Sequence, residues 1–289
     1  MRMAYLILAH EDEAQLDALL DVLVPSGASD VAIIHADRRS ALWASLRRRK
    51  CEDGRVVILR DPVDVRWGHS SQVEATAKLV VAASRAGCDY AHLISGADWP
   101  VITPAAMAAR IAAEAKPACY IEARQDYMCE RMQTYRFDSR WLRLSPENDR
   151  LAYALNWQLR RAARVFDALR ERAGFERSRP WGPWYYGSQW WSLPAEAIEL
   201  LARELPALIG SGRLAGTVCA DEHVIPTIIN HAFADRIADN RRFVSFPAGA
   251  SSPRLLGADD HDAIVRSEAW FMRKVSAAHS TFFRQFPAA

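Results

Sequence analysis

The sequence predicts an α/β protein with a mostly parallel central sheet flanked by helices. Apolar strands and helical segments alternate over the first 120 residues, and such β-α-β alternation produces parallel sheets covered by helices. The runs at residues 5–9 and 31–34 are continuously apolar, as expected for strands buried on both faces. The length of 289 residues and the globular composition allow a single domain of this class.

The predicted elements alternate regularly through the first 123 residues. Strands are expected at residues 5–9, 31–34, 56–59, 90–95 and 119–122. Helices are expected between them, at residues 12–24, 41–49, 71–85 and 104–114, where apolar residues recur at helical spacing. The helix over 71–85 has the clearest signals, because Ser71 and Glu74 match a capping box and Gly87 suits its end.

Residues 124–180 form a different segment, dense in arginine and aromatic residues, with a helix expected over 151–173. Two interpretations stay open: a lid or subdomain that faces a substrate, or a helical hairpin packed on the sheet. Basic residues cluster at 47–50 and at Arg160-Arg161. Such clusters are either solvated helix faces or contacts for an anionic lipid or acidic polymer, so peripheral membrane contact is a minority expectation.

Residues 181–289 complete the chain without a linker, so residues 1–289 are expected to form one domain. Segment 181–194 places large aromatic residues around two glycines, which suits either stacking on a sugar ring or an aromatic wedge in the core. A helix over 195–208 follows. Another helix is expected to begin near Val224, because Pro226 is tolerated only in a first turn.

Composition excludes several classes of protein. The net charge of +2 gives no general field for nucleic acid. Five cysteines without a CxxC pair indicate reduced thiols and no zinc site. No apolar run is long enough to span a bilayer, and the N-terminal strand lacks the pattern of a signal peptide, so a cytoplasmic protein is expected. Nothing in the sequence predicts the oligomeric state.

Polar residues follow the predicted strands at the edge where ligands bind in parallel sheets: His10, His35, Asp37, Ser95 and Asp98. Other candidates lie in the second half of the chain. Asp221-Glu222 precedes the helix near Val224, where Asp221 suits an N-cap and Glu222 is free to project. Arg273-Lys274 suits either a diphosphate clamp or a solvated basic surface.

These segments, in this order, resemble the core-2/I-branching glycosyltransferases, a group that contains β-1,6-N-acetylglucosaminyltransferases and peptide O-xylosyltransferases. The matching segments are residues 4–10, 34–37, 67–70, 93–100, 187–193, 221–222 and 271–274. The resemblance implies a GT-A-type fold and an inverting reaction that uses a UDP-sugar without a metal ion. It also implies a nucleotide-binding half at 1–123, a helical insertion at 124–180 and an acceptor and catalytic half at 181–289.

The family pattern assigns roles to individual residues. Glu222 matches the catalytic base, and Arg273 and Lys274, with Arg254 as a third candidate, match the cations that replace a metal on the diphosphate. Donor-binding roles fall to the strand-end residues His10, His35, Asp37, Ser95 and Asp98, with Asp37 on the ribose or uracil and Asp98 on the sugar or ribose. The sugar and acceptor pocket is expected to include Trp67, Trp190, Trp191 and Asp221.

The resemblance leaves the substrates open. The donor is expected to be UDP-GlcNAc or UDP-xylose, with UDP-GlcNAc favoured, and the acceptor a glycan or glycoconjugate such as a surface polysaccharide. The secreted members carry many paired cysteines and this chain does not, so it looks like a bacterial relative. Two alternatives remain: a non-catalytic module that binds a nucleotide sugar or carbohydrate, and a different α/β enzyme such as a nucleotidyltransferase or hydrolase.

Overall fold

The structure is a computed structural model, and it describes every residue except 52–53, 138–141, 143–149, 175–182, 251 and 288–289. Within the described residues, seven strands form the central sheet in the order β10-β6-β9-β4-β1-β2-β3. These strands are β1 (Met3–Ala9), β2 (Val31–Ala36), β3 (Val56–Ile58), β4 (Tyr90–Ser95), β6 (Cys119–Tyr120), β9 (Trp191–Pro194) and β10 (Ile237–Ala238).

Most neighbouring strands in this sheet are parallel. β1 pairs in parallel with β2 and β4, β2 with β3, and β6 with β10. Only β9 runs antiparallel to its described neighbours, β4 and β6. The predicted α/β class with a mostly parallel sheet is therefore confirmed.

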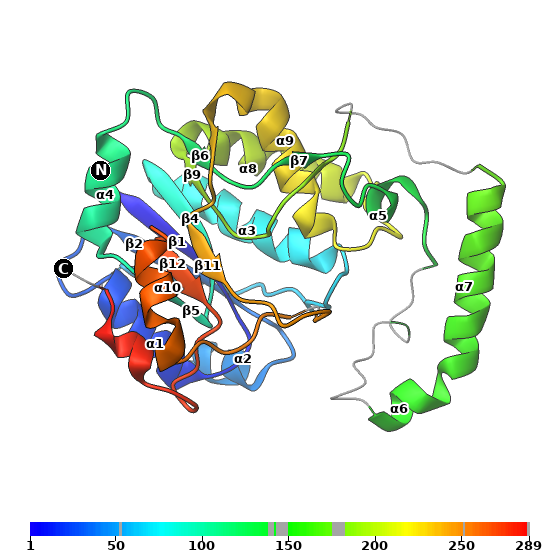
Figure 1. Cartoon of the computed structure of the whole chain (residues 1–289), viewed down its shortest axis with the longest axis horizontal. Coiled ribbons are helices and arrows are strands. Elements are labelled where there is room, and N and C mark those ends of the chain that lie inside the picture. The colour runs from blue at the N-terminus through cyan, green and yellow to red at the C-terminus, as the bar shows by residue number, and fades with distance from the viewer. Residues whose placement is uncertain (52–53, 138–141, 143–149, 175–182, 251, 288–289) are drawn as a thin grey trace.

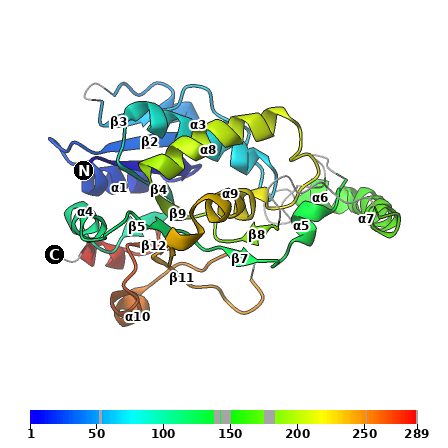
Figure 2. The ribbon, with the colours of Figure 1, turned by 90° about the horizontal axis from the view of Figure 1, so that it is seen from above.

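Alternate residues of β1 belong to two separate cores, one on each face of the sheet. Tyr5 and Ile7 lie in the core that also takes residues from α1 (Glu13–Leu23), α2 (Ala41–Leu46), α4 (Pro104–Ala112) and α10 (His261–Arg266). Ala4 and Leu6 lie in the core formed with α3 (Ser71–Ala86), α8 (Ala195–Gly210) and α9 (Val224–Phe233). Figure 2 shows these layers from above, with α3 and α8 together on one side of the sheet.

A small second sheet, in the order β11-β12-β5, lies beside the end of β4. It contains β5 (Asp98–Pro100), β11 (Arg242–Val244) and β12 (Phe271–Arg273). β12 is antiparallel to β5, with Arg273 opposite Asp98. This pairing carries the C-terminal part of the chain back to the edge of the sheet where β1, β2 and β4 end. β7 (Arg124–Gln125) and β8 (Tyr185–Tyr186) form a further two-stranded sheet.

The sequence predicted the positions and starts of these helices well, but it did not predict their capping contacts. α3 begins at Ser71, but no capping box forms: Ser70 is the N-cap without a side-chain bond, and Oγ of Ser71 accepts a bond from N of Arg66 at 2.9 Å. Asp221 is not an N-cap either, because it lies in a 3₁₀ turn, η2 (Ala220–Glu222), ahead of α9.

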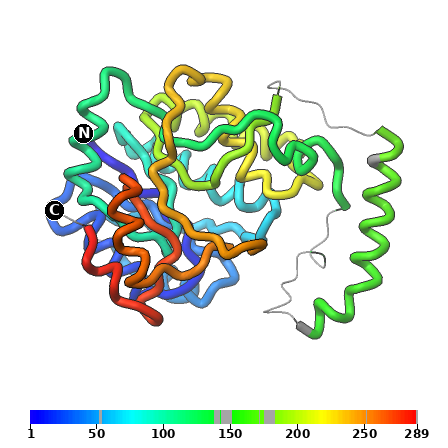
Figure 3. The backbone as a smooth tube through the Cα atoms, viewed as in Figure 1, coloured from blue at the N-terminus to red at the C-terminus, as the bar shows by residue number. Residues whose placement is uncertain are grey.

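The arginine-rich insertion contains α5 (Glu130–Gln133), α6 (Arg150–Leu155) and α7 (Trp157–Arg172) among its described residues. The single predicted helix over 151–173 is thus two helices that meet at Asn156. Figures 1 and 2 show α7 standing to one side of the sheet layers, and the backbone tube in Figure 3 shows the same separation. The interpretation as a hairpin packed on the sheet is therefore wrong for α6 and α7, whereas Cys129 and Met132, at α5, lie in the core formed with α3 and α8.

Two further features bear on the expectations from composition. None of the five cysteines, all of which lie in the described part of the chain, forms a disulfide bond. No helix in the described part of the chain combines the length and apolar character needed to cross a bilayer.

Candidate active site

A cleft of about 530 Å³ lies where β1, β2 and β4 end. Carboxyl ends of parallel strands are the usual place for ligands in such sheets. Residues from distant parts of the chain line the cleft: His10, His35, Asp37, Trp67, Ser95, Trp190, Asp221, Glu222 and Arg273. The structure therefore brings Glu222 and Arg273 into one cavity.

Glu222 is a partly buried carboxylate held by an arginine. Its Oε2 accepts a bond from Nη1 of Arg131 at 2.6 Å, and its side chain is 30% exposed. Burial raises the pKa of Glu222, while the positive charge of Arg131 acts to lower it. A carboxylate tuned in this way, on the wall of a cavity, can accept a proton from a bound hydroxyl group.

The backbone around Glu222 is fixed by the aromatic and glycine-rich segment ahead of β9. The carbonyl oxygen of Glu222 accepts a bond from N of Gly187 at 2.8 Å. A Cβ atom at position 187 would overlap the carbonyl oxygen of Glu122, so only glycine fits there. Close backbone approach thus explains one of the two glycines in this segment.

Asp221 lies behind Glu222 in the same turn and is 4% exposed. Its Oδ2 accepts a bond from Nε2 of Gln72 at 3.2 Å, and its Oδ1 has no hydrogen-bond partner among the described residues. Burial, and then the charge of Glu222, raise the pKa of Asp221 to about 7. Near neutral pH this residue is poised between its neutral and charged forms.

Arg273 is held in place by Asp98 and Trp190. Nη1 of Arg273 donates to Oδ1 of Asp98 at 2.6 Å, and the guanidinium lies 4.5 Å from the centre of the Trp190 ring. Asp98 is 1% exposed, and its other oxygen accepts a bond from N of Ser95 at 2.9 Å. Both oxygens of Asp98 are therefore engaged, and Asp98 does not line the cleft.

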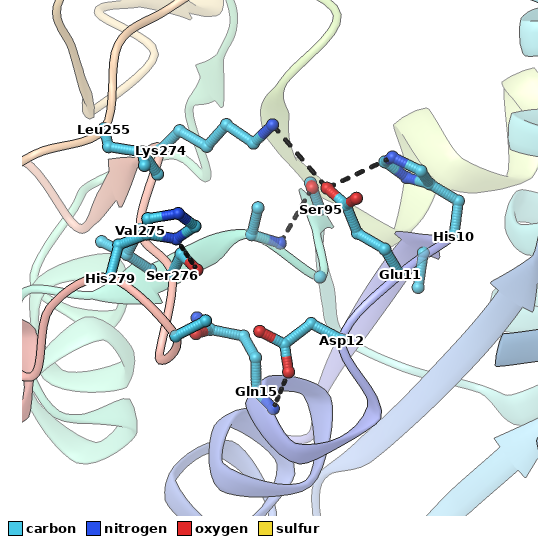
Figure 4. Close-up of a pocket in the computed structure, with 14 residues that line it drawn as sticks. His10, Glu11, Asp12, Gln15, Ser95, Leu255, Lys274, Val275, Ser276 and His279 are labelled. Atoms are coloured by element: carbon cyan, nitrogen blue, oxygen red, sulfur yellow. Dashed lines mark hydrogen bonds and ion pairs between the residues drawn. The ribbon is translucent and has the colours of Figure 1, made fainter. Parts of the chain in front are cut away.

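A second pocket of about 310 Å³ adjoins the cleft, and His10 and Ser95 line both cavities. Figure 4 shows Lys274 pointing into this pocket toward Glu11. Nζ of Lys274 lies 3.8 Å from Oε1 of Glu11, and Nε2 of His10 lies 3.5 Å from the same oxygen. The two predicted cations therefore line adjacent cavities: Arg273 lines the cleft and Lys274 lines the second pocket.

Three predicted site residues have other roles in the structure. Trp191 is fully buried in the core under α3 and α8. Its strand, β9, lies between β4 and β6 in the central sheet. The predicted place of Trp191 in the sugar pocket is therefore wrong. Arg254 binds both carboxylate oxygens of Asp260 and lines neither cavity. Asp98 acts on Arg273 and is not exposed to a donor sugar.

His35 lines the cleft but already has a structural partner. Its Nε2 accepts a bond from N of Val63 at 2.8 Å. Burial lowers the pKa of His35 to about 4, so the ring is neutral at physiological pH. The ring therefore fixes the chain at Val63 as well as shaping the cavity.

Several cleft residues were not predicted: Gln72, Glu122, Tyr186 and, through its bond to Glu222, Arg131. Glu122 is the last residue of the strand predicted over 119–122, as Ser95 is of the strand over 90–95, so the same strand-end position points to it. Tyr186 lies in the aromatic segment at 181–194, for which the sequence suggests either stacking on a sugar ring or a wedge in the core. Nothing in the local sequence distinguishes Arg131 from the other arginines of the insertion.

Comparison with known proteins places the chain in a family. It belongs to the Core-2/I-Branching enzyme family, whose sequence profile matches residues 3–256. This is a family of glycosyltransferases, so the chain is a member of that enzyme class. No curated protein matches the chain.

Solved structures resemble the chain only distantly. A Bacillus anthracis protein described as a glucose-1-phosphate thymidylyltransferase is 13% identical, with 82% of this chain and 86% of that chain covered and a TM-score of 0.36. A Thermus thermophilus mannose-1-phosphate geranyltransferase is 15% identical, with 82% and 73% covered and a TM-score of 0.35. Mouse xyloside xylosyltransferase 1 is 13% identical, with 97% and 100% covered and a TM-score of 0.33. Likenesses of this degree say nothing about the substrate.

Proposed function

We propose that the protein is an inverting glycosyltransferase that moves a sugar from a UDP donor to a hydroxyl group of a glycan or glycoconjugate without a metal ion. The observation that carries this proposal is that Glu222 and Arg273 line one cleft at the edge of the sheet. A base and a fixed cation on one cavity are the two groups that a direct displacement at a sugar carbon needs.

Glu222 would act as the base. Its carboxylate accepts the proton of the acceptor hydroxyl while the acceptor oxygen forms a bond to the anomeric carbon of the sugar. The bond from that carbon to the β-phosphate oxygen breaks, and its electron pair leaves with UDP. Attack from the face opposite the leaving group inverts the configuration.

Arg273 would stabilise the leaving diphosphate. Negative charge grows on the β-phosphate as the bond breaks, so a fixed guanidinium favours the transition state over the bound substrate. Asp98 and Trp190 hold that guanidinium before the substrate arrives. Lys274 would contribute from the adjoining pocket, where its partner Glu11 is 60% exposed and can be displaced.

The strand ends would hold the nucleoside. Asp37 lies at the end of β2 on the cleft wall, where a carboxylate can accept bonds from ribose hydroxyls or from uracil. His10 and Ser95 lie between the two cavities and would contact the donor where it passes from one to the other. Trp67, which is 68% exposed at the cleft, and Trp190 offer ring faces for sugars.

Metal independence is proposed on the environment of Asp98. This is the acid after β4, and its two oxygens are bound to Arg273 and to the backbone of Ser95. Within the described residues, no group of three or more histidine, cysteine or acidic side chains is placed to hold a metal ion. In this proposal the guanidinium of Arg273 would take the part of a divalent cation on the diphosphate.

A thermal-shift panel of nucleotide sugars, with and without EDTA, tests the donor class. A ligand that binds only the folded state raises the melting temperature with its concentration, so UDP-GlcNAc or UDP-xylose should stand out in both buffers. UDP release in the presence of glycan acceptors then tests turnover. Donor binding without any release of UDP would identify a binding module and not an enzyme, and a shift with none of the nucleotide sugars would contradict the proposed donor class.

A further inference from the structure

The outer face of the insertion is an exposed apolar surface that the proposed reaction does not use. On α7, Trp157, Ala162, Val165, Phe166 and Leu169 line a shallow depression together with Gln158 and Arg161. Val165 is 55% and Leu169 59% exposed, and Leu155 on the adjoining α6 is 80% exposed. These residues are called the outer face below. A helix of a globular protein normally buries such a stripe against its core.

The opposite side of α7 contacts neighbouring residues of the insertion, and several of these contacts are made by polar and charged side chains. Oδ1 of Asp167 accepts a bond from N of Phe137 at 2.7 Å. The guanidinium of Arg160 lies 3.7 Å from the centre of the Tyr153 ring, and Ala163 is the buried small residue on this side. Trp157, Val165 and Leu169 therefore lie away from these contacts, whereas Phe166, at the edge of the outer face, packs against Phe137 with ring centres 5.9 Å apart.

The net charge of α6 and α7 indicates which kind of partner the outer face would bind. Residues 150–172 contain six arginines and two acidic residues, a net charge of +4, whereas the whole chain carries +2. The rest of the chain is therefore net −2. Arg161 and Arg164 are exposed beside the apolar residues. A basic amphipathic helix with an exposed tryptophan is typical of segments that lie on anionic bilayers.

A second copy of the chain is a poorer match for this surface. Pairing two outer faces would cover the apolar residues, but it would also bring Arg161 and Arg164 against the same residues of the other copy. Like charges that are brought together and desolvated oppose association. An anionic lipid surface accepts the apolar side chains and supplies phosphates for the arginines at once.

We propose that the outer face of α6 and α7 docks the protein on a bilayer rich in anionic phospholipid. The arginines would bind headgroup phosphates, and Trp157, Val165 and Leu169 would enter the boundary between headgroups and acyl chains. Figures 1 and 2 show α7 standing clear of the sheet layers, where a flat surface can reach it. Attachment through this face does not depend on the donor or on the chemistry in the cleft.

Vesicle flotation of the full chain tests this directly, with vesicles of phosphatidylcholine alone or with 40% phosphatidylglycerol. We expect the protein to float with the anionic vesicles, to stay at the bottom with neutral ones, and to be released at high salt. Failure to float with anionic vesicles would overturn the proposal. Equal binding to both kinds of vesicle would also overturn it, because the arginines would then have no role.

Matched variants separate the outer face from general surface effects. Val165→Ser should weaken partitioning roughly tenfold, because two buried methyl groups are lost. Val265→Ser removes the same groups from α10, where Val265 is also 55% exposed, and should change nothing. The double variant Arg161→Gln, Arg164→Gln should lose more binding to anionic vesicles than the double variant Arg203→Gln, Arg266→Gln. Both double variants change the net charge by the same amount.

The oligomeric state in solution tests the alternative, in which the outer face pairs two copies of the chain. If the wild-type chain is a dimer that the Val165→Ser, Leu169→Ser variant converts to a monomer, the outer face is an interface between copies and the bilayer proposal is wrong. Melting temperatures within about 2 °C of the wild type would show that these surface variants remain folded. Flotation unchanged in a folded Val165→Ser, Leu169→Ser variant would equally contradict the proposal.

Discussion

Arg131 and Glu222 form an ion pair of 2.6 Å that joins the arginine-rich insertion to the carboxylate in the cleft. The pair has a direct consequence for the proposed base. Burial raises the pKa of Glu222 and Arg131 counteracts that effect, so the arginine helps to keep the carboxylate ionised and able to accept a proton.

Replacing Arg131 should therefore shift the pH profile. In Arg131→Gln the pKa of Glu222 rises further, so the acidic limb of kcat/KM should move to higher pH by about one pH unit. Activity lost at neutral pH should return in more alkaline buffer. Arg203→Gln, on α8 and 70% exposed at its side chain, is the matched control. An unmoved limb in Arg131→Gln would mean that another group is the base.

Arg273 should dominate the affinity for UDP. Arg273→Ala removes the cation from the cleft and should weaken UDP binding about 10- to 100-fold in calorimetry. Asp98→Asn should have a smaller effect, because it only releases the guanidinium from one of its two contacts. Arg254→Ala should bind UDP as the wild type does, since Arg254 lines neither cavity. A large loss in Arg254→Ala with none in Arg273→Ala would reverse the assignment.

Chelation should leave the reaction unchanged. With Arg273 engaged by Asp98, the cleft supplies its own cation, so the rate of UDP release should be the same in EDTA and in Mn²⁺. The measurement is the initial rate after extensive chelation and after the metal is added back. Activity that requires Mn²⁺ would instead assign Asp98 to a metal ion, with Arg273 displaced on binding.

Asp221 should make stability depend on pH. Its pKa is about 7 in the folded chain and about 3.9 for an unfolded aspartate. The folded state thus holds the proton more tightly, and its stability falls as pH rises between these values by up to about 1.4 kcal/mol per pH unit. Below this pH range the contribution of protonated Asp221 to stability is fully present. Above the range the loss of stability no longer changes with pH.

The Asp221→Asn variant removes this titration. The stability of this variant to urea, relative to the wild type at the same pH, should therefore be greater at pH 8 than at pH 5. Asp235→Asn is the control, because the Asp235 side chain is 74% exposed and should give the same small difference at both pH values. A difference for Asp221→Asn that does not change with pH would mean that Asp221 is ionised throughout this range.

The sheet and the strand-end residues were predictable because they depend on local patterns. Continuous apolar runs identified β1 and β2, and the polar residues that follow them reached the same edge as the topology of a parallel sheet requires. His10, Asp37 and Ser95 line the cleft for that reason.

The remaining features depend on contacts between distant segments. The engagement of Asp98 follows from the pairing of β5 with β12, which no local pattern specifies. Trp191 was misassigned because an aromatic residue beside Trp190 has the same sequence signature whether it faces a cavity or the core. Arg131 was missed because its partner lies in a turn 91 positions away.

Single-turnover measurement on Glu222→Gln tests the central proposal most directly. The amide keeps the shape of the side chain but cannot accept the proton, so transfer of the sugar should slow by about 10²–10⁴, while the Kd for UDP stays that of the wild type. Near wild-type transfer by a Glu222→Gln protein that binds UDP normally would show that Glu222 is not the base and would contradict the account.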